Sequence, residues 1–110
     1  MRRLSATFKD FERLDIRVAK LIVVENIPGM KKIMKAKVDL GDRTVYAIMG
    51  GAEYYKPSEL QGRLVAAVTN MEPRTVAGVK SECMLLAADD HGRPVWLTLA
   101  EDTPPGTKIR

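Results

Sequence analysis

The sequence predicts an all-β protein built as one five-stranded barrel, and three observations lead to this fold class. Several runs are rich in β-branched residues, and their apolar positions alternate with polar ones, which is typical of half-buried strands. Turns that contain glycine or proline separate these runs. The chain has 110 residues, enough for one small hydrophobic core, so we expect residues 1–110 to form a single domain.

The first strand is expected in the run DIRVAKLIVVE, after a short N-terminal helix over residues 7–14. The alternation in this run is imperfect, because Lys20 falls in the same phase as Ile16 and Val18. A β-bulge near Ala19 would restore the alternation, and bulges are common where a strand bends into a barrel. Either phase of this strand is compatible with an inward-facing core.

The second and third strands are expected in KAKVDLGDRTVYAIM, on either side of a tight turn at residues 41–42. In the second strand, Ala36 and Val38 alternate with Lys35 and Lys37. Because alternate side chains of a strand point to opposite faces, one face is predicted to be apolar and the other charged. The two lysines should therefore lie side by side on an exposed sheet face.

The remaining strands of the barrel follow a second helical turn. KPSELQG predicts that turn, since Pro57 suits the first position of a helix and Gly62 suits the position after its end. RLVAAVTN and SECMLLAA predict the fourth and fifth strands, joined by a loop that contains Pro73 and Gly78. Five strands with a short helix between the third and the fourth describe an OB-type barrel, a fold that often binds oligonucleotides.

An extension is expected after the fifth strand. We predict a hairpin turn at His91 and Gly92, a strand over residues 94–99 and a proline-rich tail. The fifth strand is apolar in both phases after Cys83, so both of its faces should be covered. The tail or a second subunit would provide that cover.

Composition and charge describe an ordinary basic globular protein. The formal net charge is +4, from 18 Lys and Arg against 14 Asp and Glu, which favours a polyanionic partner only mildly. The longest apolar runs are too short to span a membrane, and the charged start of the chain lacks the apolar segment of a signal peptide. One cysteine excludes an internal disulfide, so we expect a cytoplasmic protein.

Motifs for catalysis and for metal binding are absent from the sequence. Its one histidine, His91, stands in a predicted turn, and Cys83 is interpreted as a small buried hydrophobic residue. Neither C-x-x-C, H-E-x-x-H nor a G-x-x-x-x-G-K-[ST] loop occurs, and Gly50 and Gly51 are interpreted as a turn after the third strand. We therefore expect no enzyme activity, no metal and no cofactor, and we predict a binding protein.

Basic residues gather in two parts of the chain. Cations along a strand face can form a track for phosphate groups, although the same lysines could simply keep a sheet face in water. Aromatic residues make up only 5% of the chain, too few to stack a run of bases, so a nucleic-acid partner should be a folded RNA read by shape and backbone. The basic residues are Lys31, Lys32, Lys35 and Lys37 in the first part and Arg63, Arg74 and Lys80 in the second.

Three segments carry a resemblance to a known family: FERLDIRVAKL, MKKIMKAKVDLGDRTVYAIMGGAEYYKPSELQGRLV and NMEPRTVAGVKSECMLLAA. The last matches the pattern N-x-x-P-x-x-x-x-G-x-x-S-x-x-M-L-L-A-A. The chain resembles the tRNA-binding domain of methionyl-tRNA synthetases, where it forms the C-terminal or beta-subunit-like domain. Free-standing dimeric tRNA-binding proteins, endothelial monocyte-activating polypeptide II and CsaA-type chaperones are similar too. The resemblance implies an OB barrel that binds the folded body of tRNA without strong sequence preference.

The resemblance also implies which residues face the RNA. Lys32 and Arg74 would pair with phosphates. Asn70 and Ser81 would donate hydrogen bonds to phosphate or ribose, or would instead bond to the loop backbone. Glu82 would orient neighbouring cations or accept from a 2′-hydroxyl, or would hold the loop. With the strand-face cations included, the expected RNA-binding residues are Lys32, Lys35, Lys37, Asn70, Arg74, Lys80, Ser81, Glu82 and Met84.

Departures from the family pattern remove positive charge from this face. Glu72 and Thr75 stand where family members often have basic residues, and MGGA over residues 49–52 replaces SGIA. These changes predict weak tRNA affinity. They favour a second interpretation, in which the protein is a CsaA-type protein-export chaperone that binds unfolded polypeptides.

The resemblance implies a homodimer, because free-standing family members of similar length pair through the N-terminal helix and the C-terminal extension. We expect the barrel at about residues 12–88 and a dimerisation extension at about residues 89–110. The expected partners are tRNA, a second copy of the chain, and an aminoacyl-tRNA synthetase or an unfolded polypeptide, with no membrane.

Overall fold

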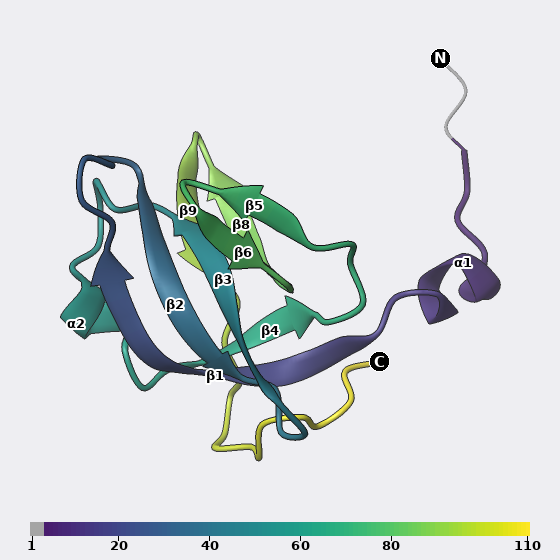
Figure 1. Cartoon of the computed structure of the whole chain (residues 1–110). Coiled ribbons are helices and arrows are strands. Elements are labelled where there is room, and N and C mark those ends of the chain that lie inside the picture. Colours follow the sequence, from purple (N-terminus) through teal and green to yellow (C-terminus); the bar gives the residue numbers. More distant parts are fainter. Residues whose placement is uncertain (1–3) are drawn as a thin grey trace.

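The structure, a computed structural model, describes residues 4–110 and shows an antiparallel barrel with one short helix set apart from it (Figure 1). Residues 1–3 of the expected 1–110 domain lie outside the described residues. The elements in chain order are α1 (Phe8–Glu12), β1 (Ile16–Asn26), β2 (Ile33–Asp39), β3 (Thr44–Gly50), α2 (Pro57–Leu60), β4 (Leu64–Val68), β5 (Arg74–Val76), β6 (Val79–Ser81), β7 (Met84–Leu85), β8 (Ala87–Asp90) and β9 (Arg93–Trp96).

Five antiparallel strands form one sheet in the order β3-β2-β1-β4-β7, and this sheet curls into a nearly closed barrel. The long strand β1 serves two neighbours: its first half, up to Lys20, pairs with β4, and its second half pairs with β2. The predicted turn at residues 41–42 joins β2 to β3, and α2 begins at Pro57 as expected. The predicted OB-type barrel with two short helices is confirmed.

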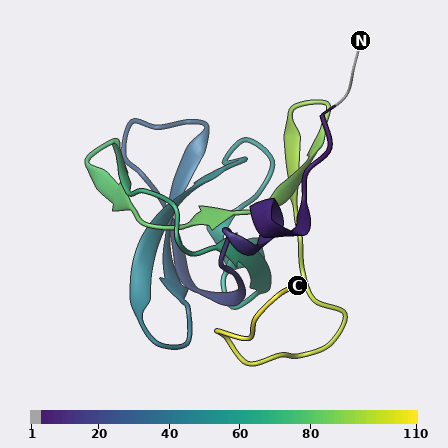
Figure 2. The same cartoon turned by 90° about the vertical axis from the view of Figure 1, so that its right-hand side faces the viewer.

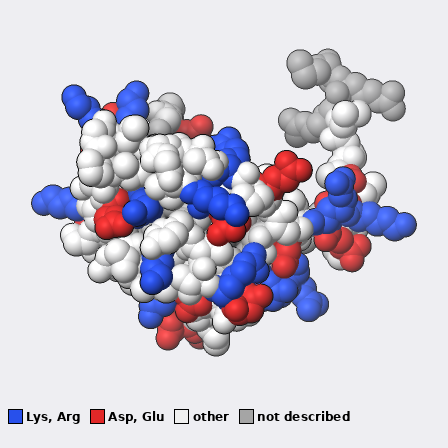
Figure 3. Space-filling model, in the orientation of Figure 1, with Lys and Arg blue, Asp and Glu red and all other residues white. Residues whose placement is uncertain are grey.

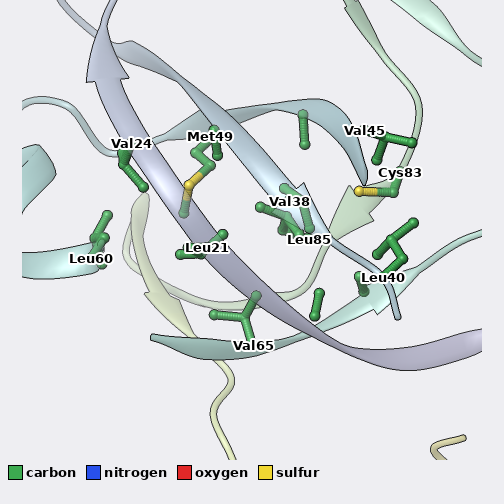
Figure 4. Packing of buried hydrophobic residues seen from close by; sticks show 14 of the residues in the cluster. Leu21, Val24, Val38, Leu40, Val45, Met49, Leu60, Val65, Cys83 and Leu85 are labelled. Atoms are coloured by element: carbon green, nitrogen blue, oxygen red, sulfur yellow. The ribbon is translucent and has the colours of Figure 1, made fainter. Parts of the chain in front are cut away.

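The interior of the barrel is filled by one phase of each strand (Figure 4). In β2, Ala36 and Val38 are fully buried, whereas Lys35 is half-buried and Lys37 exposed on the outer face. Met49 in β3 and Leu21 in β1 are also fully buried in this core. Because the inner phase is occupied by the core, these strands can contact a ligand only through their outer phase.

The irregularity in β1 lies between Leu21 and Val23, not near Ala19 as predicted. Ala19 and Leu21 belong to the central core, while Ile16 and Val18, on the opposite phase, are also buried but lie outside that core. The C-terminal segment runs along this part of β1, and its backbone hydrogen-bonds to the backbone of Ile16 and Val18. A distant segment, rather than a bulge, accounts for the adjacent buried residues.

The prediction that SECMLLAA forms one long fifth strand is wrong in its extent. The run contributes the end of β6, the whole of β7 and the start of β8, and only β7 belongs to the barrel sheet. Cys83 and Leu85 are buried, but Met84 between them is 45% exposed, so the expected cover of both faces fails at this position.

The connection between the fourth and fifth barrel strands is a hairpin rather than the predicted loop. β5 and β6 pair with each other and turn at Ala77 and Gly78, which both have positive φ. This hairpin lies beside β3, where it covers the open edge of the barrel sheet (Figure 1).

The residues that follow the barrel form the hairpin β8–β9 and an irregular tail (Figure 2). The predicted turn at residues 91–92 is confirmed, whereas the strand predicted over residues 94–99 is β9 and ends at Trp96. Trp96 and Tyr55 pack together against the core, and the Tyr55 hydroxyl donates to the Pro94 carbonyl oxygen at 2.9 Å. The hairpin is thereby fixed to the barrel.

The tail returns to the turn between β2 and β3, where two glycines meet. A Cβ atom on Gly41 would lie 2.6 Å from the carbonyl oxygen of Pro105, and one on Gly106 would lie 2.8 Å from the carbonyl oxygen of Leu40. Both glycines also have positive φ, at 93° and 91°. Glycine is therefore required at both positions, because any side chain would push the tail away from the turn.

An ion-pair cluster holds the tail to the start of β1. The Asp15 carboxylate accepts from Nζ of Lys108 at 2.9 Å and from Nε of Arg17 at 3.0 Å, and Arg17 donates also to the Gly106 carbonyl oxygen. These contacts, the hydrogen bond from Lys108 above all, hold the pKa of Asp15 below its ordinary value.

The helix α1 stands away from the barrel (Figure 1). Its start is fixed by a capping box, in which Thr7 accepts from the Asp10 backbone N–H and the Asp10 carboxylate accepts from the Thr7 backbone N–H. None of its residues is buried: Phe8 is 73% exposed and Phe11 is 39% exposed. The apolar face of α1 therefore lacks a partner within the described part of the chain.

Candidate nucleic-acid interface

The outer face of β2 and β3 places two predicted cations around one aromatic ring. Lys37 pairs in register with Tyr46, and Lys35 pairs with Ile48. Nζ of Lys35 lies 5.4 Å from the centre of the Tyr46 ring and 3.2 Å from a Glu25 carboxylate oxygen. Lys37 is exposed, and no carboxylate among residues 4–110 forms an ion pair with it. The face thus offers one unpaired ammonium group, one paired ammonium group and a half-exposed ring.

Lys32 lies directly before the first residue of β2. Its side chain is exposed, and its carbonyl oxygen accepts from the Ala52 backbone N–H at 3.2 Å, which ties the segment before β2 to the turn after β3. Lys31, the preceding residue, is exposed as well. Lys31 and Lys32 are thus exposed just before β2, Lys35 and Lys37 lie within it, and their use as a phosphate track stays a prediction.

Ser81 and Glu82 close the barrel, and this limits what they can offer a ligand. The Ser81 hydroxyl accepts from the Ile48 backbone N–H at 3.2 Å and donates to the Cys83 carbonyl oxygen at 3.4 Å. The backbone N–H of Glu82 donates to the Tyr46 carbonyl oxygen at 3.0 Å. The Ser81 hydroxyl and the Glu82 backbone therefore join the β6–β7 segment to the open edge of β3, while the role of the Glu82 carboxylate stays a prediction.

Asn70 also makes bonds within the protein. Its side-chain oxygen accepts from the Asp15 backbone N–H at 2.9 Å, and its side-chain nitrogen donates to the Arg13 carbonyl oxygen at 2.8 Å. These two bonds connect the end of β4 to the segment between α1 and β1. The backbone-bonding alternative describes this geometry, because both ends of the amide already have partners.

The hairpin β5–β6 separates two of the predicted cations. Arg74 pairs in register with Ser81, and Lys80 pairs with Thr75. Because paired residues of an antiparallel ladder share a face and adjacent residues alternate, Arg74 and Lys80 point to opposite faces of the hairpin. Nζ of Lys80 lies 3.7 Å from a Glu82 carboxylate oxygen, whereas Arg74 is exposed and has no ion pair within residues 4–110.

Tyr46 was not among the residues that the sequence assigned to the interface. The signal was present, since Thr44, Tyr46 and Ile48 form the phase of β3 opposite to the buried Val45 and Ala47. The low aromatic content of the whole chain, 5%, does not reveal this placement, because strand phase decides which rings are exposed. Tyr46 stands at the centre of the basic face because its neighbours in β2 are lysines.

The residues that sequence analysis considered for chemistry are poorly placed for it. Burial raises the pKa of the Cys83 thiol to about 11, so the thiol is neutral near pH 7. His91 lies exposed in the turn of the hairpin β8–β9 beside Asp90. Among residues 4–110, no group of three or more His, Cys, Asp or Glu side chains is arranged to hold a metal ion. No helix in the same part of the chain is long and apolar enough to cross a membrane.

Comparisons with known proteins agree with this architecture. The sequence model of the family described as "Putative tRNA binding domain" matches residues 16–108. The chain is 44% identical over 103 residues to the methionine–tRNA ligase of Pyrococcus abyssi and 38% identical over 103 residues to that of Archaeoglobus fulgidus. It is matched over 94% of its own length but spans only 14% and 16% of the length of these two ligases.

Solved structures share the fold over nearly the whole chain. A methionyl-tRNA-synthetase-related protein from Pyrococcus horikoshii matches with a TM-score of 0.92 and 27% identity, covering 98% of this chain and 100% of that one. The chaperone CsaA of Bacillus anthracis matches with a TM-score of 0.88 and 31% identity, covering 97% and 100%. On the strength of the family match and of these ligase relatives, the chain belongs to the family of tRNA-binding domains.

Proposed function

We propose that this domain binds folded tRNA without catalysing a reaction, through the outer face of β2 and β3 and the exposed arginine of the hairpin β5–β6. The observation that carries the proposal is the arrangement of Lys35 and Lys37 on one strand face beside Tyr46. Alternate residues of a strand lie about 7 Å apart, so the two ammonium groups can follow a phosphate backbone. Membership of the tRNA-binding family supports the same ligand.

The proposed mode of recognition is by shape and backbone. Tyr46 is the single aromatic side chain on the outer face of β2 and β3 within the described residues, so this face cannot stack a run of bases. Trp96 and Tyr55 are packed against the core. A folded RNA, whose phosphates have fixed positions, suits such a surface better than an unstructured strand.

The affinity of a single face should be modest. On the face drawn in Figure 3, lysine and arginine side chains are interspersed with acidic ones rather than gathered in one continuous basic area. Lys35 and Lys80 are each paired with a glutamate, at 3.2 and 3.7 Å, and these partners compete with phosphate. Glu72, a carboxylate that lines the same pocket as Arg74, adds to this effect.

A homodimer would compensate for weak single-face binding, and we propose that α1 mediates it with the C-terminal tail. Phe8, Phe11, Leu14 and Ile109 line an open hollow of about 350 Å³ between the helix and the tail. A second copy would bury these side chains and would present two RNA-binding faces to one tRNA. The segment from about residue 89 to 110 would then serve dimerisation, beside the barrel of about 12–88.

Analytical ultracentrifugation of Phe8→Ser against Tyr54→Ser tests this dimer. Tyr54 is 49% exposed and not in the hollow, so its variant is a matched control for the loss of an exposed aromatic ring. We expect dimers for the native chain and Tyr54→Ser, and monomers for Phe8→Ser. A dimeric Phe8→Ser would place the interface elsewhere.

The experiment that tests the function is a binding titration with three ligands, each at two salt concentrations: folded tRNA, an unstructured RNA of equal length and an unfolded polypeptide. We expect a preference for folded tRNA and a steep decrease of its affinity with salt. Equal affinity for the two RNAs would refute shape-based recognition. A tRNA-binding role would place the protein in the cytoplasm, alone or beside an aminoacyl-tRNA synthetase.

A second candidate function is the holding of unfolded polypeptides, which would be a chaperone activity like the one that gives the similar CsaA protein its description. The observation that favours it is the exposure of Met30, Met71 and Met84, since flexible methionines suit varied apolar segments. Tight polypeptide binding with little effect of salt and little tRNA affinity would establish this function and reject the first.

A further inference from the structure

A pocket of about 240 Å³ lies between the hairpin β5–β6 and the barrel, next to the proposed phosphate contacts. Its walls include Ile48 from β3, Val76 from β5, and Met71 and Met84 from the segments before and after the hairpin. Met71 and Met84 are 43% and 45% exposed, although large apolar side chains are usually buried. The pocket thus offers apolar contact that the fold itself does not use.

The pocket is held open by the bonds that close the barrel. The Ser81 hydroxyl connects the backbone of Ile48, in one wall, to that of Cys83, in the floor. Cys83 is buried and Figure 4 shows it among the core residues. Wall and floor are therefore fixed before any ligand arrives, which lowers the cost of ordering a binding site.

Two cations, Arg74 in the pocket and Lys35 beside it, favour an occupant that belongs to a polyanion, whereas Glu72 in the same lining opposes it. Arg74 and Glu72 both line it, and Arg74 shares the hairpin face of Ser81, which also lines it. Lys35 is the register partner of Ile48, so an ammonium group stands one strand away from the pocket wall. A nucleobase fits these features, because its flat faces are apolar and its edge can bond to a guanidinium or a carboxylate.

We infer that this pocket receives one unpaired base of a bound RNA, an inference that rests on the proposed tRNA-binding function. Its volume is below the roughly 300–1,000 Å³ of pockets for drug-sized ligands, so it suits one small planar group rather than a base pair. The ligand class is thereby narrowed to folded RNA that carries a flipped-out or terminal base near the phosphates bound by Lys37 and Arg74.

Methionine-methyl NMR of the full chain tests the inference with three probes. The probes are a single-stranded trinucleotide, its abasic counterpart with the same phosphates, and an apolar tripeptide. The Met71 and Met84 methyl signals should shift with the trinucleotide and much less with the abasic strand. Met34 and Met49, which are fully buried, are the controls and should stay unmoved.

Equal shifts with the abasic strand, or shifts with the tripeptide alone, would overturn the inference, and the second result would assign the pocket to polypeptide. Unmoved Met71 and Met84 signals at saturating trinucleotide would overturn it as well. The fully buried Met34 and Met49 report in the same spectra that the fold is intact.

Affinity measurements separate this inference from the proposed function. Met84→Ala should weaken tRNA binding by about tenfold and leave the salt dependence unchanged, since base contacts release no counterions. Leu97→Ala, which removes an equally exposed apolar side chain outside the pocket, should bind like the native chain. If the native protein binds tRNA and Met84→Ala binds it equally well, only the pocket inference is rejected. If the native protein binds no tRNA, the proposed function is rejected, and the trinucleotide spectra still decide whether the pocket binds a base.

Discussion

Replacement of Ser81 by alanine tests whether this residue closes the barrel or contacts RNA. Its hydroxyl accepts from the Ile48 backbone N–H at 3.2 Å and donates to the Cys83 carbonyl oxygen at 3.4 Å. Loss of the hydroxyl removes both bonds and leaves the Ile48 N–H, which is shielded by the hairpin, without this partner. Such a loss costs about 1–3 kcal/mol of unfolding free energy. For a domain of about 100 residues this lowers Tm by roughly 5–20 °C.

Thermal unfolding followed by circular dichroism measures this change, with Ser58→Ala as the control. Ser58 is exposed in the first turn of α2, and no side-chain hydrogen bond of it occurs within residues 4–110, so its variant should keep the native Tm to within a few degrees. Hydrogen exchange gives a local readout, because the Ile48 amide should exchange faster in Ser81→Ala. Amides of the β1–β4 ladder should exchange at a rate set by global stability alone.

Binding of tRNA well below the Tm of the variant completes the test. A closing role predicts that any loss of tRNA affinity in Ser81→Ala comes with the lower Tm and the faster Ile48 exchange, because the same two bonds also fix the pocket wall. A native Tm together with a tenfold loss of tRNA affinity would refute the reasoning and assign the hydroxyl to the RNA. An unchanged Ile48 exchange rate would also count against the bond.

Three further predictions concern charge. Replacing Lys32 and Arg74 together with alanine should lower the slope of log affinity against log salt by roughly one unit per lost phosphate contact, and an unchanged slope would reject these contacts. Because the pKa of Asp15 is lowered in the folded state, its carboxylate stabilises the fold above the unfolded pKa of about 3.9, and this stabilisation is lost as pH falls through the folded pKa. Urea midpoints of Asp15→Asn should thus be lower than native at pH 7 and converge with native below about pH 4; a constant gap would contradict the pairing. Since the pKa of Cys83 is raised to about 11, alkylation of the native protein at pH 8 should be slow by mass spectrometry and fast in urea, and fast native alkylation would show that the thiol is accessible.

The local alternation of apolar and polar residues was sufficient to predict the strands that have one buried face and one exposed face. In β2 and β3, residues such as Lys37 and Val38 alternate because one face of each strand is buried and the other is exposed to solvent. The sequence alone therefore indicates which side chains face the core. The first strand was harder because Ile16 and Val18 are buried by contact with the C-terminal segment, about ninety residues away in the chain. A window of neighbouring residues holds no information on such a contact.

The prediction of one long fifth strand was wrong for a related reason. An apolar run such as SECMLLAA fits a continuous strand. Its first residues, however, hydrogen-bond to β3, and its last residues belong to the hairpin β8–β9 instead of the barrel sheet. Both departures depend on where other strands lie. The candidate site shows the same division: exposure of the lysines followed from alternation, whereas the bonds of Asn70 and Ser81 depend on the tertiary partners Asp15 and Ile48.

The bonds made by Asn70 and Ser81 also constrain how the domain can hold its ligand. Asn70 and Ser81 bond within the protein, and Lys80 lies on the opposite face of the hairpin from Arg74, so the proposed RNA contacts reduce to four cations: Lys32, Lys35, Lys37 and Arg74. Four phosphate contacts predict a salt slope of about −3 to −4 for one face, on the B-DNA relation. A dimer that engages one tRNA with both faces would approach twice that value. The measured slope therefore reports whether one or two copies touch the RNA, and a slope near −7 that falls by half in Phe8→Ser would connect the exposed face of α1 directly to tRNA affinity.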